Sequence, residues 1–227
     1  MPEVRRRQLA ASAGLAFVAV DALALFLPGR PPKASDSARH LADALAAHRS
    51  EVLVGLYLVG LAVIALPFFL GSVRSWLARE GADEGPAIAA TGGAIVAVGA
   101  QLIGLVLFYG AAFKVAGQGQ DAVVRALTDG GNAGIEISKF GFATFIAGVC
   151  LAGGDALPSA LRRSGLVSVA ALTVSAVALF SEGRLTQFGG PLDLAGAAPG
   201  ILWVAALSVV LVSRESMRAT TAEPGLA

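Results

Sequence analysis

The sequence predicts an all-α protein, a polytopic transmembrane helical bundle with six spans and short amphipathic outer helices. Six stretches are apolar and long enough to cross a bilayer: residues 9–27, 52–70, 87–109, 135–151, 166–180 and 192–212. A hydrocarbon core about 30 Å thick needs ~20 helical residues, each rising ~1.5 Å. Because no water reaches the backbone there, such stretches must form helices.

The composition leads to the same class of protein. The chain is 56% hydrophobic and 15% charged, with a mean hydropathy of +0.72, whereas soluble domains carry about 25% charged residues. The spans take up just over half of the 227 residues and leave no room for a separate soluble domain, so residues 1–227 are expected to form a single membrane domain. A net charge of +1 offers no basic face for nucleic acid, and no nucleic-acid partner is expected.

Three arginines, Arg5, Arg6 and Arg7, directly precede the first span. Basic residues near the first span usually stay in the cytoplasm, which predicts a cytoplasmic N-terminus in a multi-pass protein of the plasma (inner) membrane. An even number of spans returns the C-terminus to the same side. An alternative stays open, because Ala22-Leu23-Ala24 resembles the cleavage site of a signal peptide.

A short outer helix is predicted within residues 35–50, between the first and second spans. Leu41 and Leu45 share one helical face there, and Asp36, His40 and Asp43 share another. An amphipathic pattern of this kind is typical of a helix that lies along the membrane surface.

A second amphipathic outer helix is predicted at residues 118–127. Its apolar residues Val123, Val124 and Leu127 are set against the charged residues Asp121 and Arg125. The glycines at positions 130 and 131 are expected to end it.

Prolines mark two of the spans. Pro67 predicts a kink or a loosened last turn near the end of the second span. In the sixth region, either a helix begins at Pro191 and kinks at Pro199, or the span begins at Pro199. The first alternative is favoured because residues 199–212 alone would barely cross the core. The interruptions do not fall in corresponding spans, so the repeat pattern of secondary transporters is absent.

Three ionisable residues inside the spans are the default candidates for function: Asp21, Glu136 and Lys139. Asp21 and Lys139 are expected at similar depths, where they could form a structural ion pair. Alternatively, Glu136 and Lys139 pair with each other, three residues apart on one helix, while Asp21 reaches the headgroups. A third alternative is an outward-facing polar pocket that binds a small polar or ionic ligand.

Gln101 lies in the middle of the third span among small residues: Gly92, Gly93, Ala97, Gly99, Ala100 and Gly104. Small residues let helices approach closely, and an amide can donate a hydrogen bond across the contact. Helix packing and contact with a ligand are both consistent with this pattern. Asp21, Gln101, Glu136 and Lys139 together form the candidate ligand-binding set.

No catalytic, metal or cofactor site is predicted. The sequence contains no phosphate-binding glycine loop, no zinc-protease motif and no nucleophile elbow. Asp36, His40 and Asp43 share a face, but His40 is the only histidine on it and Arg39 is close by. This favours a solvated surface over a metal site. The only cysteine, Cys150, is expected to be a small buried apolar residue.

Short motifs in the second half resemble a known family. They are Asp129-Gly130-Gly131-Asn132, Phe140–Ala147, Ala156-Leu157-Pro158 with Arg162, Arg163 and Gly165, Gly189-Gly190-Pro191-Leu192, and Leu202-Trp203-Val204 with Arg214. From about Glu51 to Arg214 the chain resembles the uncharacterised bacterial six-helix membrane proteins grouped as domain of unknown function 4386. Glu136 and Lys139 depart from the pattern of this family, since its members usually have apolar residues at the corresponding positions. The resemblance implies a six-span plasma-membrane protein and carries over no functional residue.

The function predicted from these observations is a non-enzymatic membrane component or regulator. Its partners are the lipid bilayer and either another protein or further copies of the chain in a homo-oligomer. The alternative is a carrier of small molecules or ions with an outward-facing polar cavity.

Overall fold

The computed structural model describes residues 3–26, 36–180 and 190–222, and these residues form helices and turns without a strand. The helices are α1 (Glu3–Phe26), α2 (Ala38–Ala47), α3 (Arg49–Arg79), α4 (Glu84–Tyr109), α5 (Asp121–Gly153), α6 (Ser159–Ser175) and α7 (Pro191–Ala222). All except α2 are long and apolar enough to cross a membrane. The structure therefore confirms the all-α class and the six spans of a multi-pass membrane protein.

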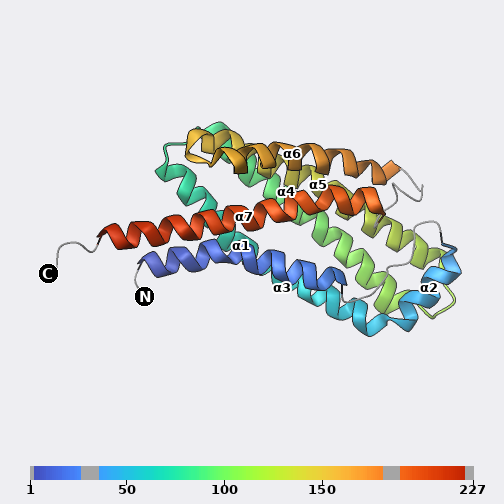
Figure 1. Cartoon of the computed structure of the whole chain (residues 1–227). Coiled ribbons are helices and arrows are strands. Elements are labelled where there is room, and N and C mark those ends of the chain that lie inside the picture. The colour runs from blue at the N-terminus through green and yellow to red at the C-terminus, as the bar shows by residue number, and fades with distance from the viewer. Residues whose placement is uncertain (1–2, 27–35, 181–189, 223–227) are drawn as a thin grey trace.

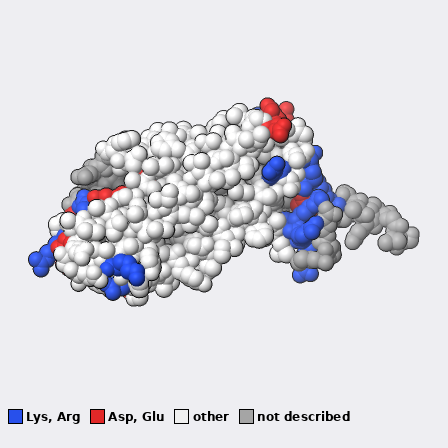
Figure 2. Space-filling model, turned by 180° about the vertical axis from the view of Figure 1, so that it is seen from behind, with Lys and Arg blue, Asp and Glu red and all other residues white. Residues whose placement is uncertain are grey.

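The six long helices run along one axis of an elongated bundle, with both termini at one end and α2 at the other (Figure 1). On the face shown in Figure 2, charged side chains gather at the two ends of the molecule, and an uncharged belt separates them. Large apolar side chains in the middle of the spans are exposed, among them Ile64, Ile95 and Ile103. Such a belt is the surface expected against lipid tails.

The centre of the bundle is α5, which is the most buried of the spans and packs most extensively against α4. Glycines allow the two backbones to touch. A Cβ on Gly141 would lie 2.5 Å from the backbone nitrogen of Ala97, and one on Gly148 would lie 2.6 Å from that of Ala90. Buried Gly93, Ala97 and Gly104 line the α4 side, which confirms the prediction that small residues of the third span mediate helix packing.

The prediction of a second, separate outer helix at residues 118–127 is wrong. Helix α5 begins at Asp121 and continues without a break through Gly130 and Gly131. A Cβ on Gly131 would lie 2.8 Å from the ring of Phe108. This glycine therefore serves close packing inside a helix, where the sequence pattern indicated a helix end.

The first outer helix is confirmed as α2. Its N-cap residue is Ser37, whose hydroxyl accepts a hydrogen bond from the His40 backbone N–H at 3.2 Å. Leu41 and Leu45 are buried in a small apolar cluster with Ala111, Ala112, Ala116 and Val124. Helix α2 thus covers the π-helical turn Gly110–Val115 that follows α4, together with the start of α5.

The helices around α5 complete the bundle. Helix α1 packs against α3 and α7, and α6 packs against α5 and α7. Helix α3 continues through Pro67. Helix α7 begins at Pro191 and continues through Pro199, which confirms the longer of the two alternatives for the sixth span.

Candidate functional site

Lys139 lies between two carboxylates in the interior of the bundle. Its Nζ donates hydrogen bonds to Oε2 of Glu136 at 2.6 Å and to Oδ1 of Asp193. The three side chains are exposed by 7%, 1% and 7% respectively. We call these three residues the buried ionic cluster, and it joins α5 to the first turn of α7.

The local sequence explains this geometry. Glu136 and Lys139 are three residues apart, so they lie on the same face of α5. Asp193 comes from the first turn of α7, which begins at the same end of the bundle as α5. Of the alternatives that the sequence left open, the Glu136–Lys139 pair is therefore confirmed. The Asp21–Lys139 pair is wrong, because within residues 3–26, 36–180 and 190–222 the ion-pair partners of Lys139 are Glu136 and Asp193.

Sequence reasoning missed Asp193. The rule that selected Glu136, an ionisable residue near the outer end of a predicted span, applies equally to Asp193, the second residue of the predicted span 192–212. The signal was therefore present in the sequence. Comparing the starts of the fourth and sixth spans would have brought the two carboxylates together.

Asp21 and Gln101 form a second polar contact, separate from the buried ionic cluster. Asp21 is half-buried on α1, and the side-chain amide of Gln101 on α4 is its hydrogen-bond partner. The structure thus divides the four predicted site residues into two pairs, Asp21 with Gln101 and Glu136 with Lys139. They do not line one common pocket.

One atom of the buried ionic cluster is left without a partner. Oε1 of Glu136 is buried and has no hydrogen bond with any residue that the structure describes. A buried acceptor without a donor costs about 1–3 kcal/mol, and more when it is charged. Lys139 offsets that cost through the other oxygen of the same carboxylate.

The cluster is arranged to hold helices together. Moving an ion out of water costs several kcal/mol, and the cost is repaid only when partners are close and hydrogen-bonded. An ammonium group that donates to two carboxylates has no free electron pair, so Lys139 cannot act as a nucleophile or base in this state. Among the described residues, no group of three or more His, Cys, Asp or Glu side chains is placed to hold a metal ion.

A second network of ion pairs lies at the end of the bundle that carries the termini, and all its side chains except that of Glu215 are more exposed than the buried ionic cluster. Arg79 of α3 binds Glu215 of α7, and Arg218 lies 2.9 Å from Glu80 and 3.9 Å from Glu215. Arg214 lies 3.8 Å from Glu80. We call these five residues the terminal network. Helix α7 is therefore joined to its neighbours by ion pairs at both of its ends.

The predicted polar face of α2 is a surface feature. His40 lies 3.8 Å from Asp36, and its side chain is 67% exposed.

Comparisons with known proteins add no further constraint on this site. No family model, no curated protein and no solved structure matches the chain. The resemblance to the domain of unknown function 4386 therefore stays a prediction.

Proposed function

We propose that this protein is a non-enzymatic component of the plasma membrane that acts through partner proteins, with both termini in the cytoplasm. The observation that carries the proposal is the way its intramembrane polar groups are used. Lys139, Glu136 and Asp193 bind one another between α5 and α7, and Asp21 meets Gln101 between α1 and α4. These groups join helices, which favours a structural role over catalysis.

The outward face of α4 supports a partner inside the membrane. Six exposed residues on this helix repeat at alternating intervals of three and four: Ala89, Gly92, Val96, Gly99, Ile103 and Val106. A Cβ on Gly92 or Gly99 would meet no atom within 4 Å. A seam with this spacing and these small residues is typical of a surface on which a second transmembrane helix packs.

The orientation rests on the distribution of arginines. Both termini lie at one end of the bundle (Figure 1), where Arg5, Arg6 and Arg7 begin α1 and the terminal network contributes three more arginines. Basic residues near span ends are retained in the cytoplasm. This supports cytoplasmic termini, and in that orientation α2 would lie on the outer surface.

Site-specific photocrosslinking in native membranes tests the partner. A photoreactive amino acid is introduced at Ile103 on α4 or, as a control, at Val167 on α6; the two side chains are equally exposed, at 64% and 63%. We expect a protein adduct of one defined mass from position 103 and only lipid adducts from position 167. Lipid adducts alone at both positions would contradict the proposal, and the mass would distinguish a second copy from another protein.

A carrier of small ligands is the second candidate function. Two observations favour it: the Asp21–Gln101 contact within the spans and the unpartnered Oε1 of Glu136. Under this hypothesis, a panel of alkali cations and small amino acids should contain a compound that raises the melting temperature of the wild type. Gln101→Leu should abolish that rise while leaving the unliganded protein folded, and an unchanged rise would exclude Gln101 from a binding site.

A further inference from the structure

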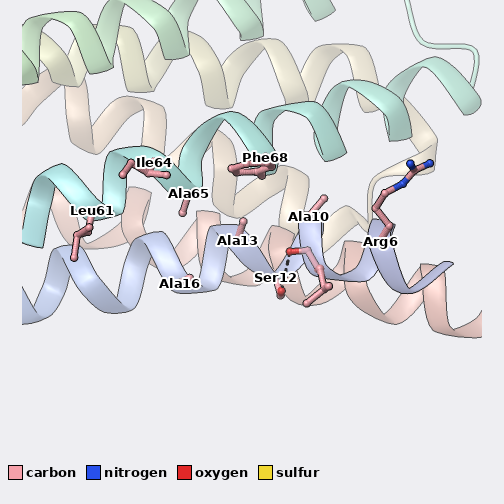
Figure 3. A pocket seen from close by; sticks show the side chains of 10 residues that line it. Arg6, Ala10, Ser12, Ala13, Ala16, Leu61, Ile64, Ala65 and Phe68 are labelled. Carbon is pink, nitrogen blue, oxygen red and sulfur yellow. Dashed lines mark hydrogen bonds between the residues drawn. The ribbon is translucent and has the colours of Figure 1, made fainter. Parts of the chain in front are cut away.

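A groove of about 610 Å³ runs between α1 and α3 on the surface of the bundle. Ala10, Ala13 and Ala16 of α1 form one wall, and Ile64 and Phe68 of α3 form the other (Figure 3). The hydroxyl of Ser12 donates a 2.9 Å hydrogen bond to the Leu9 carbonyl of its own helix. The lining between the two ends of the groove is therefore almost entirely apolar.

Arg6 lies at one end of this groove, at the end of the bundle that carries the termini (Figures 1 and 3). Its side chain is exposed and makes no hydrogen bond or ion pair with any residue of the described ranges. The arginines of the terminal network differ, because each of them is paired with Glu80 or Glu215. Arg6 is thus a cation at headgroup depth, above an apolar groove that enters the lipid belt.

The volume and position of the groove restrict what can occupy it. Helices α1 and α3 already pack against each other, and the groove lies between their outer surfaces. A further helix with its side chains is about 10–12 Å across and would rest over such a groove without filling it. An acyl chain is one methylene wide and can lie along it. About 11 residues of α1, from Arg6 to Ala16, give the groove a length of ~15 Å at 1.5 Å per residue.

We propose that this groove binds one anionic phospholipid from the leaflet on the side of the termini. One acyl chain lies between α1 and α3, against Ala13, Ala16 and Phe68. The headgroup phosphate pairs with the Arg6 guanidinium, whose planar donors suit a phosphate. Charge complementarity selects an anionic headgroup, since a basic residue near the surface attracts anionic lipid.

The test measures lipid retained by the purified full chain in mild detergent, using native mass spectrometry. The probes are dioleoylphosphatidylglycerol, dioleoylphosphatidylcholine and inorganic phosphate. We expect one phosphatidylglycerol per chain to be retained in preference to phosphatidylcholine. Arg6→Gln should weaken this binding about fivefold, and Arg5→Gln, an exposed neighbour outside the groove, should not. Inorganic phosphate should give no increase in melting temperature, since it has no acyl chain.

A second pair of variants tests the chain-binding part of the groove. Ala16 and Ala19 are both exposed on α1, but only Ala16 lines the groove. Ala16→Phe should abolish retention of phosphatidylglycerol, and Ala19→Phe should retain it. Equal retention by wild type, Arg6→Gln and Ala16→Phe would overturn the proposal, as would equal retention of phosphatidylcholine. Should Ala16→Phe fail to fold, the Arg6→Gln and Arg5→Gln comparison decides alone.

Discussion

Helix α7 is joined to the bundle at both ends by ion pairs, but the two ends differ in their contact with solvent. At its first turn, Asp193 meets Lys139, and both side chains are 7% exposed. At its other end, Arg218 meets Glu80 with side chains 44% and 25% exposed. The same kind of interaction is therefore made once in a dry interior and once at a wet surface.

This difference decides what each contact contributes to stability. Exposed ion pairs gain about 0–1 kcal/mol because water and salt screen them. A buried pair gains little net stability over an apolar replacement, but loss of one partner leaves an uncompensated charge. We infer that the buried ionic cluster fixes which surfaces of α5 and α7 face each other, and that the exposed Arg218–Glu80 pair adds about 0–1 kcal/mol.

The largest effect is expected from Lys139→Met. It leaves Glu136 and Asp193 buried without their shared cation, at a cost of about 3–5 kcal/mol. Thermal unfolding in detergent would show this as a large fall in melting temperature. The triple variant Glu136→Gln, Lys139→Met and Asp193→Asn removes all three charges and should recover much of the loss. A single variant as stable as the wild type would show that the cluster does not fasten α5 to α7.

The second largest loss of stability is expected from Gly141→Ala, which tests how much close packing between α4 and α5 contributes compared with the buried ionic cluster. In Gly141→Ala, the new Cβ would meet the Ala97 backbone nitrogen at 2.5 Å, and α4 would have to move. We expect a loss of about 1–3 kcal/mol in the free energy of unfolding. Gly99→Ala is the matched control, because its Cβ meets open space and alanine favours a helix. It should be neutral or slightly stabilising, and an equal loss in both variants would contradict the packing argument.

Arg218→Met tests the exposed side of the comparison. It removes the 2.9 Å partner of Glu80, but Arg214 stays 3.8 Å from the same carboxylate and Arg79 still binds Glu215. We expect a loss of about 1 kcal/mol or less, the scale of exposed pairs. Because salt screens such pairs, the difference in stability between this variant and the wild type should shrink in 1 M salt. The difference between Lys139→Met and the wild type should not shrink. Losses of equal size in both variants would remove the distinction between the two ends of α7.

The smallest effect is expected between Asp21 and Gln101. A double-mutant cycle with Asp21→Ala and Gln101→Ala should give a coupling free energy of about 0.6 kcal/mol, the average for interhelical hydrogen bonds in membranes. The cycle of Asp21→Ala with Lys139→Met should be additive, since the structure places these residues in separate contacts. Coupling in the second cycle and not in the first would favour the Asp21–Lys139 pair.

Much of the fold follows from the sequence because apolar length is a strong signal in a membrane. Apolar length predicted all six spans. The amphipathic pattern predicted the outer helix around Leu41 and Leu45, and the proline pattern predicted the start of α7 at Pro191. The predicted helix end at Gly130 and Gly131 was wrong because two glycines in succession usually end a helix in water. Here Gly131 brings α5 against Phe108 on α4, and a tertiary contact of this kind is not visible in the local pattern.

The contacts of the candidate site that lie within one helix were predictable from the sequence, and those between helices were not. Glu136 and Lys139 are neighbours on one helix, so their spacing alone predicts the pair. Asp193 is 54 residues from Lys139, and only the packing of α7 on α5 brings the two side chains together. Gln101 was predicted from its position at mid-span, but its partner Asp21 depends on how α1 approaches α4.

Because Cys150 is buried, the reactivity of its thiol can be used to detect opening of the helical bundle. The thiol lies where α5 meets α6, with Sγ 3.8 Å from the Arg162 carbonyl oxygen, and a Cβ on Gly165 would collide with that sulfur. It is the only cysteine in the sequence. Modification by a thiol reagent therefore requires α6 to separate from α5, and its rate in intact membranes measures how often that separation occurs.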